Sequence, residues 1–230
     1  MTGKPGEPFN SEKHEAILRN LKKGDTLITF NYDLLIEESF HEDQRLWNPR
    51  DGYGTQIQGS TFAWSRTWLS EHERSPKNSE ILILKLHGSL NWTLYRNRTI
   101  RLKPLPYVVR TRGGKPAFEK VSILPPGWNK RIDRNPYKLF WRQARLRLEK
   151  CKTLVIIGYS LPETDLLAQA LFAEIVRMRV ARGDYLKQLH LVDPDETLKS
   201  RFVSLFTPAL GAYGSIFKYR DFHEFVDKVK

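Results

Sequence analysis

The chain has 230 residues, of which 40% are hydrophobic and 28% charged, a composition typical of a soluble globular protein with one large or two small domains. The 38 Lys and Arg residues exceed the 26 Asp and Glu residues, and the net charge of +12 suits an anionic partner: nucleic acid, an acidic membrane surface or a phosphate-bearing ligand. A single cysteine, Cys151, excludes an internal disulfide and a cysteine-based zinc site. The N-terminus lacks a signal peptide and no apolar run approaches the ~20 residues of a membrane helix, so we expect a cytoplasmic protein without membrane contact.

The first third of the chain predicts one helix, one strand and a second, short helix. Ser11 can cap the first helix, and Gly24 sits where a helix C′ glycine belongs. The apolar residues 26–30 predict a buried strand, and residues 34–38 predict a short helix. Residues 41–80 are polar, aromatic and glycine-rich, which indicates an irregular insertion.

The middle of the chain predicts a second buried strand followed by short β elements. Residues 81–86 are almost wholly apolar and end at His87, and residues 91–95 can begin a hairpin. Residues 99–109 and 121–124 predict further short strands, so that 91–130 forms a second insertion.

Helices and strands alternate in the last third of the chain. A third buried strand, a fourth strand and a last short strand are expected at residues 153–157, 188–192 and 216–219. Helices are expected at residues 136–150, at 163–182, after Asp195 through Phe206, and after a cap at Asp221. This alternation predicts an α/β fold: a Rossmann-like parallel sheet with helices on both faces, plus small irregular and β insertions, in a single domain over residues 1–230.

Polar side chains follow each predicted strand, and ligands of such sheets bind at the carboxyl ends of the strands. Four strands that deliver polar groups to one edge therefore indicate a site. The residues are Asn31 and Asp33, His87, Ser160 and Asp165, and Asp193 and Asp195.

Each of these residues also has an ordinary structural role. Asn31 can hold a hydroxyl or position a water, and it can equally be a turn residue or helix cap. Asp33 is a helix-start carboxylate or a ligand contact. His87, followed by Gly88, can act as a general base on a ribose hydroxyl or serve as a structural hydrogen-bonding histidine.

The segment Gly158-Tyr159-Ser160 has the form of a tight strand-to-helix turn. The helix that follows would direct its N-terminus to the same edge, which makes the turn a phosphate or ribose cradle. The alternative is an ordinary turn in which Ser160 caps the helix.

Four segments in chain order resemble the SIR2-like domains of bacteria, distant relatives of the sirtuins that are found in many anti-phage defence systems. The resemblance covers residues 25–195. Its motifs are Thr29-Phe30-Asn31-Tyr32-Asp33, Leu86-His87-Gly88-Ser89-Leu90-Asn91-Trp92, Ile157-Gly158-Tyr159-Ser160-Leu161-Pro162-Glu163-Thr164-Asp165 and Leu191-Val192-Asp193-Pro194-Asp195.

The resemblance implies that NAD is the ligand and that Asn31 and His87 are the catalytic pair. Asn31 matches the asparagine that positions water or ribose near the nicotinamide ribose, and His87 matches the general base. The cofactor-binding positions that it implies are Asp33, Gly88, Gly158, Tyr159, Ser160, Asp165 and Asp193.

Two features depart from the family pattern. Members begin with a strand and a glycine-rich turn that wraps the pyrophosphate, whereas Gly3, Gly6 and Gly24 here are isolated, so we expect the first β–α unit to be missing. Another subunit or an upstream segment would supply it, or the start codon is misassigned. Sirtuin deacylases also carry a four-cysteine zinc module, and a single cysteine argues against zinc-dependent deacylation and leaves no metal expected.

The function implied is therefore hydrolysis of the N-glycosidic bond of NAD with release of nicotinamide, in an NAD glycohydrolase of defence type. The alternative is a non-catalytic module that senses NAD or an ADP-ribose-like nucleotide, or that docks a partner protein of a defence system or a second copy of the chain.

Nucleic-acid binding rests only on charge. Trp64, Trp68 and Trp92 could stack on bases, but they are expected to be core residues of the insertions. The series Arg142, Arg145, Arg147 and Lys150 is typical of a solvated helix face, and Cys151 is expected to be an inert thiol.

Overall fold

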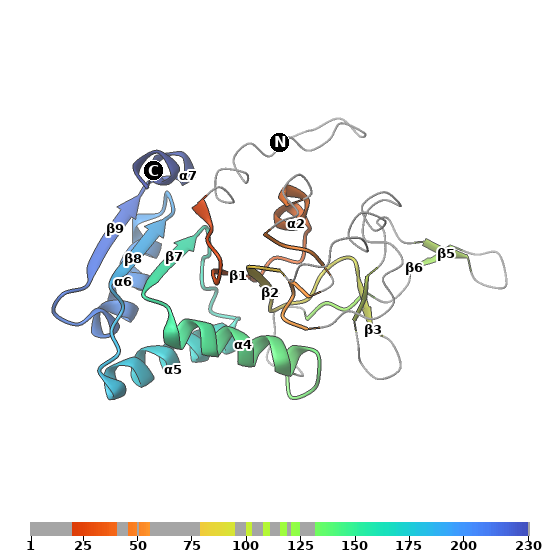
Figure 1. Cartoon of the computed structure of the whole chain (residues 1–230), viewed down its shortest axis with the longest axis horizontal. Helices are drawn as coiled ribbons and strands as arrows, with labels where there is room; N and C mark the ends of the chain where they lie inside the picture. Colours follow the sequence, from red (N-terminus) through yellow and green to blue (C-terminus); the bar gives the residue numbers. More distant parts are fainter. Residues whose placement is uncertain are drawn as a thin grey trace. The chain divides into compact units, whose positions relative to one another are not determined.

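The computed structural model describes residues 20–40, 46–49, 51–55, 79–94, 100–102, 108–110, 116–118, 121–124 and 132–229. These residues form two compact units (Figure 1). The second unit holds Ile28–Phe30, Leu84–Gly88 and the described residues from Ile123 onward, and the first unit holds the others. The single-domain organisation stays a prediction.

The second unit is an α/β structure built on a three-stranded parallel sheet. Residues of β7, β8 and β9 pair in register, so that Val155, His190 and Phe217 lie side by side. The strands are β7 (Thr153–Ile157), β8 (Gln188–Val192) and β9 (Ser215–Tyr219), and the helices are α4 (Tyr137–Lys150), α5 (Leu166–Arg182), α6 (Glu196–Leu210) and α7 (Phe222–Lys228). The strands run parallel and alternate with helices along the chain, which confirms the predicted Rossmann-like α/β fold.

Helices cover both faces of this sheet. Because side chains alternate along a strand, Leu189 and Leu191 of β8 share one face and Val192 lies on the other. Leu191 faces α6 across a hollow that Phe202 also lines, whereas Val192 packs in a cluster with Phe225 of α7. The prediction of helices on both faces is confirmed for this sheet.

The prediction that residues 153–157 form a fully buried strand is wrong. Thr153, Val155 and Ile157 are exposed, and only Ile156 is buried. The reason is the position of β7 at the edge of the three-stranded sheet, with α7 packed at the β9 side of the face to which Val155 and Ile157 belong. An apolar run alone does not separate a central strand from an edge strand.

Two further strands form a separate pair. β1 (Thr26–Thr29) and β2 (Leu82–Lys85) are hydrogen-bonded neighbours. The amide of Leu82 donates to the carbonyl of Asp25 and that of Leu86 to the carbonyl of Thr29. Both residue numbers rise together, so the strands run parallel. β2 is mostly buried, as its apolar run predicts, whereas β1 is about half buried, so the prediction of a buried strand at residues 26–30 is met only in part.

The first unit contains α2 (Leu35–Ser39) and two small antiparallel hairpins. β3 (Trp92–Leu94) pairs with β4 (Ile100–Leu102), and β5 (Val108–Arg110) pairs with β6 (Pro116–Phe118). Trp92 is fully buried and meets the ring of Tyr53 edge to face at 5.0 Å. Trp92 is thus a core residue, as expected, whereas Trp64 and Trp68 lie outside the described residues.

Several element ends differ from the predictions. α5 begins at Leu166 because residues 162–165 form a turn, and α6 extends beyond Phe206 to Leu210. Residues 121–124 contribute only a β-bridge between Gly88 and Ile123. Gly24 is not at a helix C′ position, because the chain leaves the helix after Asn20. The helix that Ser11 would cap lies outside the described residues.

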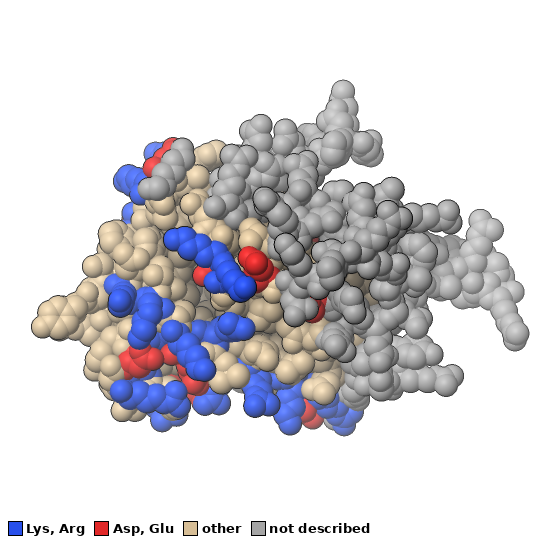
Figure 2. Space-filling model, viewed as in Figure 1, with Lys and Arg blue, Asp and Glu red and all other residues tan. Residues whose placement is uncertain are grey.

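Basic side chains gather on the surface of α4 and α5, interspersed with acidic ones (Figure 2). Arg145 pairs with Glu149 and Glu174, and Arg182 pairs with Glu149. These ion pairs offset part of the positive charge, so the predicted solvated face describes this surface better than a binding stripe for nucleic acid. No helix among the described residues is long and apolar enough to span a bilayer.

The thiol of Cys151 is partly buried at the end of α4. Burial raises the pKa of this thiol, and the nearby Arg179 guanidinium only partly opposes that effect. A thiol that stays protonated is a poor nucleophile, which agrees with the predicted inert role.

Acidification is expected to destabilise the second unit through His190. Its ring is buried, stacks on Phe217 and Tyr219 at 4.7 and 5.8 Å, and has a pKa that burial lowers. The unfolded chain takes up the proton below about pH 6.5, before the folded chain does, so the free energy of unfolding falls as the pH drops through this window. The slope is at most about 1.4 kcal/mol per pH unit for one proton.

Urea denaturation at about pH 7.5 and about pH 5.5 measures this slope. His190→Phe keeps an aromatic ring in the stack and should flatten the dependence, whereas His223→Phe, on the exposed surface of α7, should keep it. Equal slopes in wild type and His190→Phe would contradict the assignment.

Candidate functional site

The carboxyl ends of four strands lie in the second unit. Phe30 directly follows β1, His87 follows β2, Gly158 follows β7 and Asp193 follows β8. In parallel sheets these ends are where ligands bind, since loops and helix N-termini converge there. The candidate site is therefore built from the segments just beyond the strands.

His87 is buried among aromatic side chains. Its side chain is only 8% exposed, and its ring lies edge to face with Phe30 at 5.4 Å and near Trp141 at 6.5 Å. The Trp141 indole donates to the carbonyl of Leu86, and the amide of Leu124 donates to the carbonyl of His87. The backbone on which the imidazole stands is thus fixed on both sides.

Asp165 is the acidic partner of His87. Its Oδ2 lies 3.1 Å from Nε2 of His87, and the carboxylate is 1% exposed. Asp165 occupies the N-cap position of α5, but its side chain makes no capping hydrogen bond there. The hydroxyl of Tyr159 donates to the same Oδ2 at 3.1 Å. The imidazole of His87 and the phenol of Tyr159 therefore converge on one buried carboxylate oxygen.

The turn after β7 contributes the side chain of Tyr159 to the site, and the backbone N–H of Gly158 does not point into it. Gly158 has φ of +58°, and its N–H donates to the carbonyl of Val192 at 3.0 Å, so this amide is engaged in the sheet. Leu161 has φ of +45°, a conformation that costs a non-glycine residue about 1 kcal/mol or more. Tyr159 stacks on Phe30 at 4.1 Å with the rings nearly parallel.

The phenol of Tyr159 keeps its proton at any physiological pH. Burial is the largest cause that raises the pKa of this phenol, and the negative charge of Asp165 and its hydrogen bond raise the pKa further. A neutral phenol is a hydrogen-bond donor to a carboxylate, so Tyr159 stabilises the ionised form of Asp165.

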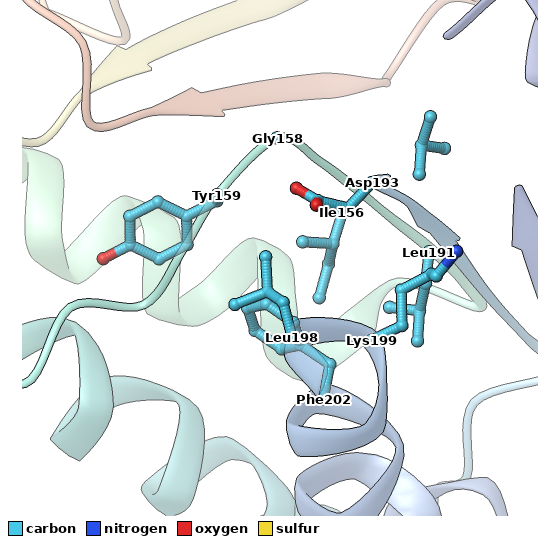
Figure 3. A pocket seen from close by; sticks show the side chains of 9 residues that line it. Ile156, Gly158, Tyr159, Leu191, Asp193, Leu198, Lys199 and Phe202 are labelled. Atoms are coloured by element: carbon cyan, nitrogen blue, oxygen red, sulfur yellow. The ribbon is translucent and has the colours of Figure 1, made fainter. Parts of the chain in front are cut away.

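A small hollow opens beside this turn (Figure 3). Asp193 lies at its side, with the amide of Asp195 donating to its Oδ1 at 2.8 Å. Lys199 is buried, with its ammonium near Glu196 at 2.5 Å and donating to the carbonyl of Tyr219 at 3.3 Å. The lining residues are Ile156, Gly158, Tyr159, Leu191, Val192, Asp193, Leu198, Lys199 and Phe202.

The remaining sequence candidates have simpler surroundings. Asn31 is exposed and belongs to the first unit. Asp33, in the same unit, accepts a hydrogen bond from the amide of Leu35 at the start of α2, which is the helix-start role considered for it. Gly88 is buried with φ of +86°, and Ser160 is exposed.

The structure brings together His87, Tyr159 and Asp165 by direct contact, and Gly158, Tyr159 and Asp193 around the hollow. Sequence reasoning missed Phe30 and Lys199. Phe30 ends an apolar run and resembles a core residue, and Lys199 lies within a helix with no strand end beside it in the sequence. Helical spacing from the Asp195 cap, which places position 199 one turn into α6, is the only sequence signal for Lys199.

Comparison with known protein families matches the SIR2-like domain to residues 25–186. The chain belongs to the SIR2-like domain family. The matched range contains Asn31, His87 and Asp165, and it ends before Asp193. A search of curated proteins found no match.

Membership in the SIR2-like family connects the geometry to NAD, because sirtuin-related proteins are often NAD-consuming enzymes. In this SIR2-like domain the histidine of the Leu86-His87-Gly88 motif is buried and paired with a carboxylate. A histidine so oriented is suited to proton transfer, whereas a surface histidine is not fixed in this way.

Proposed function

We propose that this SIR2-like domain binds NAD and hydrolyses the N-glycosidic bond between nicotinamide and ribose. The buried pair of His87 and Asp165 at the carboxyl end of β2 is the observation that carries the proposal. Family membership supports NAD as the ligand. A paired histidine in a packed site supports turnover over mere binding, since a purely structural role does not require a proton acceptor at a strand end.

The reaction breaks the bond from C1′ of the ribose to the pyridine nitrogen. The bonding electrons stay with nicotinamide, which leaves as a neutral molecule, and positive charge develops on the ribose as an oxocarbenium-like species. A water oxygen then bonds to C1′, and the proton that it loses passes to His87 acting as general base. The products are nicotinamide, ADP-ribose and one proton.

Asn31 and Asp193 take positioning and binding roles in this proposal. The exposed amide of Asn31 can accept from the attacking water and donate to a ribose hydroxyl. Asp193 borders the hollow beyond β8, where a carboxylate accepts hydrogen bonds from the hydroxyls of the adenosine ribose. Neither role requires a metal ion.

A second candidate function is a module that holds an ADP-ribose-like nucleotide without turnover. It is favoured by the hollow beside Gly158 and Tyr159, where the carboxylate of Asp193 can accept hydrogen bonds from a ribose. Titration calorimetry with NAD and with ADP-ribose separates the two: the module binds tightly and leaves NAD intact.

The direct test incubates the purified full chain with NAD and follows nicotinamide by chromatography. We expect release by the wild type and a rate about 10²-fold lower in Asn31→Ala, because one group that orients the water and the ribose is lost. Asn20→Ala, which changes another exposed asparagine, should retain the wild-type rate. Absence of nicotinamide release by the wild type would overturn the proposed hydrolysis.

A further inference from the structure

The side chain of Asp165 does not cap α5, although the residue occupies the N-cap position of that helix. A residue at an N-cap position usually accepts a hydrogen bond from the first turn of its helix, and Asp165 does not do so with its side chain. It is also nearly inaccessible to solvent, although an isolated carboxylate is costly to bury. Something other than helix capping therefore accounts for its placement.

The two side chains that meet at Oδ2 supply the explanation. Nε2 of His87 and the hydroxyl of Tyr159 each lie 3.1 Å from this oxygen. The positive end of the α5 dipole at the helix N-terminus further favours a negative charge at this position. The carboxylate is thus stabilised as an anion that can accept hydrogen bonds but cannot donate them.

An ionised acceptor at Nε2 determines where the neutral imidazole carries its hydrogen. The contact is favourable only when Nε2 bears the proton, which places the acceptor lone pair on Nδ1. The stacking of Tyr159 on Phe30 and the edge-to-face contact of Phe30 with His87 hold both donors in place.

We propose that Asp165 is a positioning residue that fixes His87 in its Nε2–H tautomer and so makes Nδ1 the nitrogen that takes the proton from water. Tyr159 is the second donor that keeps the Asp165 carboxylate oriented toward His87. When Nδ1 gains its proton, the buried carboxylate stabilises the imidazolium that results. The catalytic consequence rests on the proposed NAD hydrolysis, whereas the tautomer itself does not. Asp165 is thereby removed from the set of nucleotide contacts that the family resemblance implies.

The tautomer is measured without any substrate. Two-bond ¹H–¹⁵N correlation spectra of the ¹⁵N-histidine-labelled full chain, at a pH where histidines are neutral, distinguish Nε2–H from Nδ1–H for each of the six histidines. The signal of His87 is assigned as the one lost in His87→Gln. We expect the Nε2–H pattern in the wild type, and finding the Nδ1–H pattern there would overturn the proposal.

Asp165→Asn tests the cause. An amide can present either its oxygen or its NH₂ group to Nε2, so we expect His87 to lose its single Nε2–H pattern or to switch to Nδ1–H. Asp184→Asn makes the same change at a carboxylate that pairs with Lys152 away from the site, and it should leave the His87 signals and NAD turnover unchanged. An Asp165→Asn protein with the wild-type His87 pattern would overturn the proposal, and if that variant does not fold, the wild-type spectrum still decides.

Kinetics separate this inference from the proposed function. If the wild type hydrolyses NAD, we expect kcat to fall about 10²-fold in Asp165→Asn with little change in KM, because the base is in the wrong tautomer while the nucleotide contacts remain. A tautomer switch in a protein that does not hydrolyse NAD would sink the proposed function alone. Hydrolysis with an unchanged tautomer in Asp165→Asn would sink the positioning role alone.

Discussion

Replacing His87 with glutamine should lower kcat for NAD hydrolysis about 10³-fold, within the range of ~10²–10⁴ that a general base contributes. Glutamine is chosen because its amide NH₂ can still donate to the buried carboxylate of Asp165. The variant therefore loses the proton acceptor while it keeps a hydrogen bond that stabilises the buried carboxylate. Alanine at this position would confound catalysis with folding.

The measurement is steady-state nicotinamide release over a range of NAD concentrations, together with thermal unfolding. We expect KM to change little, since the acceptor lone pair matters in the transition state and not in the bound ground state. His223→Gln is the matched control, because the same substitution falls on the exposed surface of α7. A folded His87→Gln protein with wild-type kcat would show that the base lies elsewhere.

Much of the fold follows from sequence periodicity and from punctuation by glycine, proline and capping residues. Asp195 and Asp221 cap α6 and α7 with their side chains, as acidic residues before an amphipathic run predict. The periodicity of a strand does not show which strands lie beside it in the sheet. Val155 and Ile157 are as apolar as the buried Leu189 and Leu191, and they are exposed because β7 lies at a sheet edge.

The residues of the candidate site could be predicted from the sequence, but the contacts between their side chains could not. The rule that polar residues after parallel strands converge found His87 and Asp165, and Tyr159 was indicated by the turn motif and the family resemblance. Their contacts depend on a turn in which Leu161 adopts positive φ, a conformation that its residue type does not signal. The family resemblance implies a nucleotide contact for Asp165, within the predicted helix at residues 163–182, although its carboxylate faces the imidazole of His87.

Hydrophobic residues of the site were invisible to the same rule. Phe30 completes the apolar run that predicts the strand at residues 26–30, yet it stacks on Tyr159 and contacts the His87 ring edge to face. An aromatic residue at the end of a predicted strand, such as Phe30, can therefore line a site as well as belong to the core. Titratable and hydrogen-bonding side chains in the sequence indicate where a site lies. The residues that hold them in position are identified only when the three-dimensional packing is known.

The largest stability effect should come from Arg179 of α5, which is buried although it carries a charge. Its guanidinium donates to the carbonyls of Leu148, Cys151 and Asp184. Carbonyls at the C-terminus of α4 have no partner within the helix and carry the negative end of its dipole, so a cation there is stabilised. Arg179 thereby joins the end of α4, the segment before β7 and the segment after α5.

Arg179→Met keeps most of the aliphatic volume and removes all of these donors, and buried carbonyls without a donor cost about 1–3 kcal/mol each. We expect the free energy of unfolding to fall by about 3 kcal/mol in urea denaturation followed by circular dichroism. Arg177→Met, on the exposed surface of the same helix, should change it by less than about 0.5 kcal/mol. If Arg179→Met were as stable as Arg177→Met, water would have to satisfy those carbonyls equally well, and the guanidinium would not be the group that joins α4 to α5.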